Sequence, residues 1–297
     1  MNGILLINKP QGFTSFDVIA KLRGILRIKR LGHAGTLDPM ATGVLPVFVG
    51  KATRACDILP NNEKSYTASF KLGVKTDTQD SSGTVVSKSD KRVSKSILED
   101  ILTLFKGETE QFPPMYSAVS VNGQRLYDLA RQGIEVERQP RTIFIEEIKL
   151  NGFDEESQTG EMFISCSKGT YIRTIIHDIG EKLGCGGIMT ALVRNSSSGF
   201  KLSDCLSFED VISLKEQNKL EDRIIPIERA FECLEKIILT NEQTVMYKNG
   251  VKLDINRIDV NVSDNKYRVY SNDDRFLGTA TIRKETMELI CDKNFFE

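Results

Sequence analysis

One aspartate stands in a setting that suits chemistry. Asp38 is followed by Pro39, which biases the aspartate toward an extended backbone, and Gly32, Gly35 and Gly43 surround it. Glycines let a main chain approach a ligand closely, and glycine-rich loops between regular elements are places where a scaffold presents functional groups. The carboxylate of Asp38 could act as a nucleophile or as an anion that receives a positive charge. From the residues alone, it could equally cap the turn that follows.

The rest of the chain offers few groups for metal or thiol chemistry. It contains two histidines, His33 and His177, and six cysteines that lie far apart without a C-x-x-C pair. This pattern argues against a zinc site and a disulfide framework, and favours reduced cysteines that serve as small packing residues. Asp77 and Asp80 share a Gly/Ser-rich turn, where paired carboxylates are usually solvated. We therefore expect no cation at that turn.

Length and composition describe an ordinary globular protein of about two domains. The 297 residues include 40 basic and 41 acidic side chains, with 40% hydrophobic and 27% charged residues overall. No stretch approaches the roughly 18 apolar residues of a membrane span, and the N-terminal apolar run is too short for a signal peptide. We therefore expect a cytoplasmic protein.

Local charge is more informative than net charge. Residues 1–60 carry eight basic and three acidic side chains, a net charge of +5. Such a cluster suits a polyanion, because each neutralised phosphate releases condensed counterions. A solvated helix face over residues 21–30 explains this cluster about as well.

Short regular elements must position the loop that contains Asp38. Residues 3–8 read as a buried strand, a helix capped by Ser15 is expected over residues 16–27, and the apolar run 44–49 follows the loop. Further elements are expected as strands at 65–72, 142–150 and 161–167, and as helices at 94–105 and 170–183. Because strands and helices mix without a regular βαβ alternation, the pattern favours an α+β fold over a doubly wound one.

Two other regions differ in character from this pattern. Residues 112–141 contain prolines, glycines and several arginines, which indicates an irregular arm with a short helix at 124–132. Toward the C-terminus, a turn at 248–250 and the runs 267–270 and 276–282 read as hairpins of a small β domain. We assign residues 1–236 to the first domain and residues 237–297 to the second.

The loop itself has a long and specific sequence. Residues 32–46, hereafter the signature loop, read GHAGTLDPMATGVLP, and this string strongly resembles the signature of the TruB family of tRNA pseudouridine-55 synthases. The resemblance extends, in the right order, to GILLINKPQG at 3–12, GVKTDTQD at 73–80, MYSA at 115–118, RQGIEV at 131–136, CSKGTYIRT at 166–174 and EKLG at 181–184. It covers the chain from residue 3 to about residue 200.

The resemblance implies an enzyme that isomerises a uridine in the T loop of tRNA, at position 55. Its catalytic domain would be built on a mixed, mainly antiparallel sheet, followed by a small PUA-like β domain. The reaction breaks the N-glycosidic bond and rejoins the base to the ribose through C5, so it needs no metal, nucleotide or redox cofactor. Asp38 takes the place of the nucleophile, and attack at the sugar or at the uracil ring stays open. A hydrolase would want a second carboxylate to activate water, and the motif offers one acid.

The same resemblance implies the residues that receive the base. Arg173 would pair with Asp38, orient it and hold its pKa down. Tyr66 would stack on the uracil, and Tyr171 and Leu192 would line the pocket. A base inside a folded RNA loop must be flipped out at a cost of a few kcal/mol, and the resemblance assigns His33 as the wedge that fills the gap.

Four basic residues are further candidates for RNA contacts. They are Lys9, Arg131, Arg141 and Arg194, of which Lys9 is also expected to support the signature loop. The arm at 112–141 resembles the mobile thumb of the family, which closes over RNA. Where the family usually has two arginines after Leu192, this chain has Val193 and Arg194, so one phosphate contact is missing from the pattern.

Other classes of function remain open at this point. The chain could be an RNA-binding or folding protein with an inactive site, or the related synthase that works inside a guide-RNA complex. The motif residues argue against the first, and the arm argues against the second. We expect tRNA as the partner, no obligate protein partner and a monomer. The C-terminal domain would hold the acceptor end of tRNA or serve a structural role.

Overall fold

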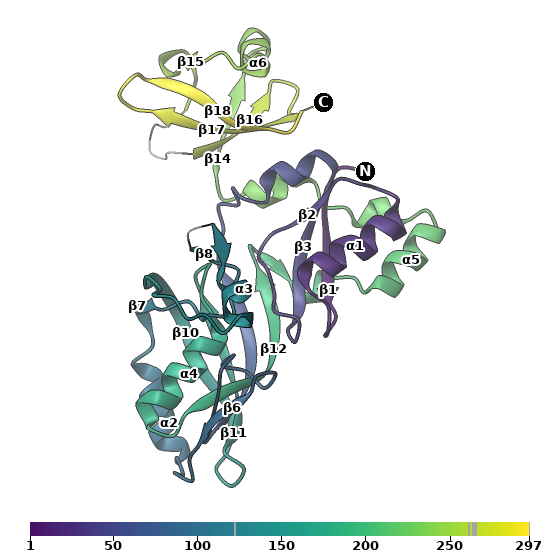
Figure 1. The fold of residues 1–297 in the computed structure, drawn as a ribbon. Coiled ribbons are helices and arrows are strands. Elements are labelled where there is room, and N and C mark those ends of the chain that lie inside the picture. Colours follow the sequence, from purple (N-terminus) through teal and green to yellow (C-terminus); the bar gives the residue numbers. More distant parts are fainter. Residues whose placement is uncertain (122, 261, 263–265, 297) are drawn as a thin grey trace.

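Two β-sheets organise the chain. The computed structural model describes residues 1–121, 123–260, 262 and 266–296. Within them, the larger sheet has the strand order β1-β3-β12-β4-β11-β10-β7, with β2 and β13 attached to β3 and β12, and the smaller has the order β14-β16-β17-β18-β15 (Figure 1). The larger-sheet strands are β1 (Gly3–Lys9), β2 (Leu31–His33), β3 (Thr42–Val49), β4 (Lys64–Leu72), β7 (Gly107–Gln111), β10 (Arg141–Asp154), β11 (Thr159–Cys166), β12 (Gly187–Ser197) and β13 (Phe200–Lys201).

The remaining elements surround these strands. The smaller sheet contains β14 (Glu235–Leu239), β15 (Leu253–Asp254), β16 (Lys266–Ser271), β17 (Phe276–Arg283) and β18 (Glu288–Asn294), and two short hairpins are formed by β5 (Val74–Thr76) with β6 (Val85–Lys88) and by β8 (Ser120–Val121) with β9 (Gln124–Arg125). The helices are α1 (Ser15–Leu26), α2 (Lys95–Thr103), α3 (Leu126–Arg131), α4 (Ile172–Leu183), α5 (Phe208–Glu216) and α6 (Asn241–Lys248). Short 3₁₀ turns lie at Gly50–Ala55, Leu202–Asp204, Leu220–Arg223, Ile227–Phe231 and Ile255–Arg257. In the described part of the chain, no helix has the length and apolar character that a membrane crossing requires.

The larger sheet is mainly antiparallel, as expected from the sequence. Its parallel pairing joins β12 to β3, where Val193 lies opposite Thr42 and Arg194 opposite Gly43. Figure 1 shows α2 and α4 on one face of this sheet and α1 and α5 beside β1 and β3. The prediction of an α+β fold with a mixed sheet and a small C-terminal β domain is confirmed.

The start of α1 differs from the sequence expectation. The residue that caps the helix is Thr14, whose hydroxyl accepts from the Asp17 N–H while the Asp17 carboxylate accepts from the Thr14 N–H. Ser15, expected as the cap, is instead buried, and its hydroxyl accepts from the N–H of Leu37 at 2.9 Å. The serine therefore ties α1 to the signature loop, one residue before Asp38.

The C-terminal domain packs against the N-terminal region. Phe231, Phe276 and Phe295 share an apolar cluster with Ile4 and Phe48 of the larger sheet. The expected hairpin of β16 and β17 is present. A turn is present at 249–250, as expected, but the hairpin predicted there is wrong, because Lys248 ends α6 and the turn closes that helix.

The predicted domain boundary falls inside β14. All five residues of this strand pair in parallel with β16 of the smaller sheet. We therefore propose that the second domain begins before Glu235.

Candidate active site

The signature loop rests on a buried lysine. Lys9, at the end of β1, is fully buried, and its ammonium donates to the carbonyl oxygens of Pro10 at 3.1 Å, Phe13 at 2.5 Å and Pro39 at 3.2 Å. Burial lowers the pKa of Lys9 to about 8, against the opposing attraction of Asp38. Since three carbonyls bind the ammonium, Lys9 fixes the backbone directly after Asp38.

A buried arginine supports the loop from the other side. Arg194 of β12 is fully buried; its Nε donates to the carbonyl of Val44 at 2.7 Å and its Nη2 to that of Gly35 at 2.9 Å. Gly43 has φ +106°, and a Cβ there would lie 2.3 Å from the carbonyl oxygen of Arg194. The close approach of the two strands thus requires glycine.

The burial of Lys9 and Arg194 bears on two of the sequence predictions. Lys9 and Arg194 were candidates for direct RNA contact, but both side chains are enclosed and bonded to loop carbonyls. A phosphate of an RNA ligand cannot reach them without displacing the loop. Both residues therefore support Asp38 from within the protein.

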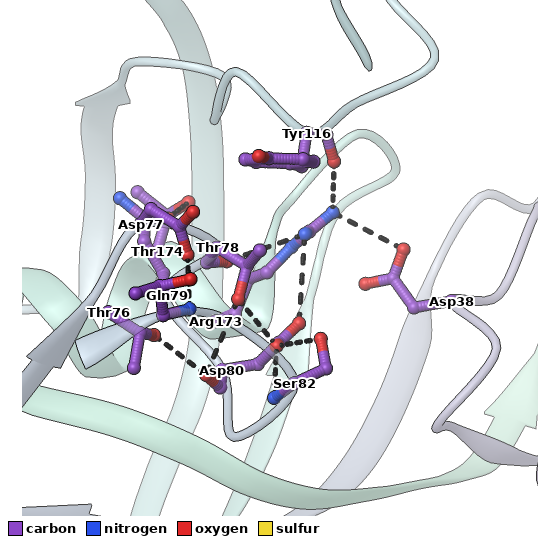
Figure 2. A network of polar contacts seen from close by, with 11 residues as sticks. Asp38, Thr76, Asp77, Thr78, Gln79, Asp80, Ser82, Tyr116, Arg173 and Thr174 are labelled. Atoms are coloured by element: carbon purple, nitrogen blue, oxygen red, sulfur yellow. Dashed lines mark hydrogen bonds and ion pairs between the residues drawn. The ribbon is translucent and has the colours of Figure 1, made fainter. Parts of the chain in front are cut away.

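Asp38 itself lies at the open end of this arrangement. Its side chain keeps 35% of its surface exposed, and its Oδ1 lies 3.3 Å from Nη2 of Arg173 (Figure 2). Burial raises the pKa of Asp38, the Arg173 guanidinium opposes that rise, and the charge of Asp80 adds to it. The expectation that Arg173 holds this pKa down captures one contribution, but the net direction is upward because desolvation is the larger effect.

Arg173 connects three segments of the chain. It lies in the first turn of α4 with only 5% of its side chain exposed. Besides Asp38, its guanidinium donates to the carbonyl oxygens of Tyr116 at 2.7 Å and Thr78 at 3.5 Å, and its Nη1 lies 3.8 Å from Oδ2 of Asp80. The guanidinium is therefore held between two carboxylates, as Figure 2 shows.

Asp80 is the site residue that the sequence reasoning missed. It is buried, with 4% of its surface exposed, and its Oδ1 accepts from the Thr78 hydroxyl at 2.7 Å and from the N–H and hydroxyl of Ser82 at 2.9 and 2.5 Å. The expectation of a solvated carboxylate is wrong for Asp80, whereas Asp77 is exposed. Hydroxyl residues two positions before and after an aspartate were the available signal for such a turn.

The predicted pocket residues gather beneath the signature loop. Tyr66 and Leu192, each 6% exposed, share an apolar cluster with Leu37 and Ala41 of that loop. Tyr171 is half-buried, and its ring centre lies 6.0 Å from Cζ of Arg173. The stacking of uracil on Tyr66 stays a prediction.

The remaining candidates lie nearer the surface. His33 ends β2 and is half-buried; burial and the nearby charge of Arg194 lower its pKa, which favours a neutral ring. Its Nδ1 has no partner among the described residues. Arg131 and Arg141 are exposed on the arm and at its end, and Arg131 lies over the ring of Tyr127 at 5.5 Å. Their contacts with RNA stay predictions.

The comparisons with known proteins agree with this arrangement. Residues 23–172 match the N-terminal domain of the TruB family of pseudouridylate synthases, and residues 173–232 match a tRNA pseudouridylate synthase B C-terminal domain. A tRNA pseudouridine synthase B of Clostridium acetobutylicum is 43% identical over 291 residues, which cover 98% of this chain and 99% of the relative. One of Dehalococcoides mccartyi is 44% identical and covers 96% of this chain and 93% of its own length.

A solved structure gives the same result for the fold. The crystal structure of a Cbf5-Nop10-Gar1 complex contains a chain with a TM-score of 0.78 and 25% identity, covering 99% of this chain and 85% of that one. The catalytic domain has the pseudouridine synthase fold, and the C-terminal domain is a PUA-like β domain. Since the family models cover most of the chain and relatives above 40% identity span nearly all of it, this chain belongs to the TruB family of pseudouridylate synthases.

Proposed function

We propose that this protein converts uridine 55 in the T loop of tRNA to pseudouridine, with Asp38 as the nucleophile. Membership of the family, and relatives named tRNA pseudouridine synthase B, support isomerisation of a uridine in tRNA. The position within tRNA rests on the resemblance of the signature loop. The observation that carries the chemistry is the Asp38–Arg173 pair, which joins a buried cation to a carboxylate that stays open to solvent.

The arrangement suits an isomerisation that conserves every atom of the nucleotide. Asp38 attacks either C1′ of the ribose or the uracil ring; the N-glycosidic bond breaks, the base turns, C5 bonds to C1′, and the bond to Asp38 breaks to restore the free carboxylate. The proton leaves C5 and N1 gains one, so the overall reaction consumes no second substrate. Arg173 keeps the attacking carboxylate oriented while charge moves.

The pocket residues have roles consistent with a flipped base. Tyr66 and Tyr171 provide aromatic faces, and Leu192 provides an apolar wall next to the signature loop. The lowered pKa of His33 favours a neutral ring, which suits insertion into a base stack better than a charged one. We further propose that exposed Arg131 and Arg141 contact RNA phosphates.

We also propose that the enzyme acts alone on tRNA as a monomer. The related solved chain comes from a complex with other proteins, whereas the relatives that span this chain at 43–44% identity are named for tRNA. This difference favours the stand-alone enzyme over a synthase that works inside a guide-RNA complex.

The test is pseudouridine mapping on an unmodified tRNA transcript incubated with the purified protein alone. We expect one new pseudouridine, at position 55, with the wild type and none with Asp38→Asn, which should still bind the transcript. A transcript with cytidine at position 55 serves as the control and should gain no modification. Pseudouridine at another position would overturn the assigned site. Binding without any turnover by the wild type would overturn the enzyme and favour an RNA-folding protein.

A further inference from the structure

We propose that Gln111 is a positioning residue that fixes Tyr171 in the active site; the inference rests on the proposed function. Gln111 is the last residue of β7 and is 3% exposed. Its side-chain Oε1 accepts from the Tyr171 N–H at 2.8 Å, and its Nε2 donates to the Tyr171 carbonyl oxygen at 3.0 Å. One side chain therefore bonds both backbone polar groups of Tyr171, whose carbonyl oxygen also accepts from the N–H groups of Thr174 and Ile175 at 3.1 Å.

The two hydrogen bonds from Gln111 lie at the start of α4. Tyr171 is the residue that precedes the helix, with an extended backbone (φ −98°, ψ 106°) and no capping bond from its own side chain. Helix N-termini need such partners, because their first N–H groups have none within the helix. The next turn contains Arg173, the partner of Asp38. Gln111 thus holds the backbone from which two active-site side chains project.

Gln111 also directly precedes the arm at 112–141. In the pairing of β7 with β10, Gln111 lies opposite Arg141, so both ends of the arm meet at this position. A second contact joins the arm to α4, since the Tyr116 carbonyl accepts from Arg173 at 2.7 Å. A displacement of the residues where the arm begins would therefore move the backbone of Tyr171 through its two hydrogen bonds with Gln111.

The chain contains a matched arrangement outside the active site. Gln158 is 5% exposed; its Oε1 accepts from the Val93 N–H at 3.0 Å and its Nε2 donates to the Val93 carbonyl at 2.9 Å. Val93 directly precedes Ser94, the residue that caps α2. Both glutamines therefore clasp the backbone at the start of a helix, but only Gln111 does so beside Arg173 and Asp38.

The experiment compares Gln111→Met with Gln158→Met, because methionine keeps the length of the side chain and removes the two hydrogen bonds to the helix start. Gln158→Met also removes a third bond, from Nε2 to the Glu155 carbonyl oxygen at 2.8 Å. The melting temperature of each protein variant is measured first. The reaction rates are then measured with the tRNA transcript at a temperature where both variants are folded. We expect Gln158→Met to lower the melting temperature at least as much as Gln111→Met. Gln111→Met should lower kcat about tenfold with KM changed less than about twofold, as a small misplacement of a pocket group predicts, and Gln158→Met should keep its kcat.

A conservative variant adds a pH readout. In Gln111→Glu, the ionised carboxylate can accept from the Tyr171 N–H but repels its carbonyl oxygen, whereas the protonated carboxyl can donate to that oxygen. Relative to the wild type, the kcat of this variant should recover as the pH falls, and Gln158→Glu should show no such recovery.

The possible failures are distinct from one another. Equal losses of kcat in the two methionine variants, or an unchanged kcat in Gln111→Met, would overturn the positioning role alone, because the wild type would still turn over. A wild type that binds tRNA without turnover would overturn the proposed function and this inference with it.

Discussion

The two carboxylates that flank Arg173 lie in regions that differ in solvent exposure and in hydrogen bonding. Asp38, on the signature loop, keeps 35% of its side chain exposed, and in the described part of the chain its carboxylate is bonded by Arg173. Asp80 lies in the turn formed by residues 76–84, hereafter the acidic turn, with 6% of its side chain exposed and three hydrogen bonds from Thr78 and Ser82. One carboxylate is open and sparsely bonded, and the other is enclosed and satisfied.

This difference separates the reacting group from its support. Three hydrogen bonds hold Oδ1 of Asp80, and its Oδ2 lies 3.8 Å from Nη1 of Arg173 with 6% of the side chain exposed, so Asp80 serves as a fixed counterion. It holds Arg173, which in turn orients Asp38. Each step away from Asp38 should therefore weaken the effect of a substitution on the rate.

The two regions also rest on different chemistry. Buried cations, Lys9 and Arg194, hold the signature loop by its carbonyl oxygens. Neutral hydroxyls of Thr78 and Ser82 hold the acidic turn. The support of the signature loop should therefore respond to pH in a range where hydroxyls do not titrate.

The sharpest test of the comparison is Asp80→Asn, which removes the charge and keeps the size. Because Arg173 loses one of its two carboxylate partners, we expect kcat to fall by about 10²-fold with KM little changed, the loss expected from a misplaced catalytic group. Single-turnover kinetics on tRNA measures this against the complete loss expected for Asp38→Asn. Asp77→Asn, on the exposed part of the same turn, is the matched control and should keep the wild-type rate. A loss as complete as that of Asp38→Asn would contradict the division of roles.

The second test concerns the free energy of unfolding and its dependence on pH. Burial lowers the pKa of Lys9 from 10.5 in the unfolded chain to about 8 in the fold. Between these values the unfolded chain binds more protons, so the stability contributed by Lys9 rises with pH and is lower below pH 8. Compared with Lys9→Met, the wild type should gain about 3 kcal/mol across this range, at roughly 1.4 kcal/mol per pKa unit.

Urea denaturation at several pH values between 7.5 and 10.5 measures that difference. Lys71→Met, at an exposed position of β4, serves as the control, and its stability relative to the wild type should stay constant. A constant difference between the wild type and Lys9→Met would mean that the lysine under the signature loop is not desolvated.

The sequence alone predicted the residues that are local or carried by a contiguous motif. Asp38 and its glycines form one unbroken string, and Arg173 lies within a second string at 166–174. Their pairing in the structure is confirmed by a distance of 3.3 Å. The alternating and helical patterns similarly placed β1, β4, β10 and β11 and the helices α1, α2 and α4, with shifts at their ends, but no expected strand covered β12.

What the sequence could not reveal depends on burial by distant strands. Arg194 is enclosed because β12 pairs in parallel with β3 and antiparallel with β4, and no local pattern distinguishes such an arginine from an exposed one. The burial of Asp80 has the same origin, since its turn pairs with Met189 of β12. The hairpin expected at 248–250 failed for another reason: the turn is present, but Asn-Gly closes helices as well as hairpins.

The smallest effect expected within the acidic turn belongs to Ser82→Ala. The substitution removes the hydroxyl that donates to Oδ1 of Asp80 at 2.5 Å, while the N–H of Ser82 can still donate to the same oxygen. We expect the free energy of unfolding to fall by about 1 kcal/mol, the typical net contribution of one hydrogen bond, and kcat to fall no more than about fivefold. Denaturation and the tRNA assay measure both, with exposed Ser81→Ala as the control. A rate loss as large as that of Asp80→Asn would mean that the hydroxyl, and not the charge of Asp80, keeps Arg173 in place. The expected order, Asp38→Asn above Asp80→Asn above Ser82→Ala, follows because each group acts on the base only through the one before it.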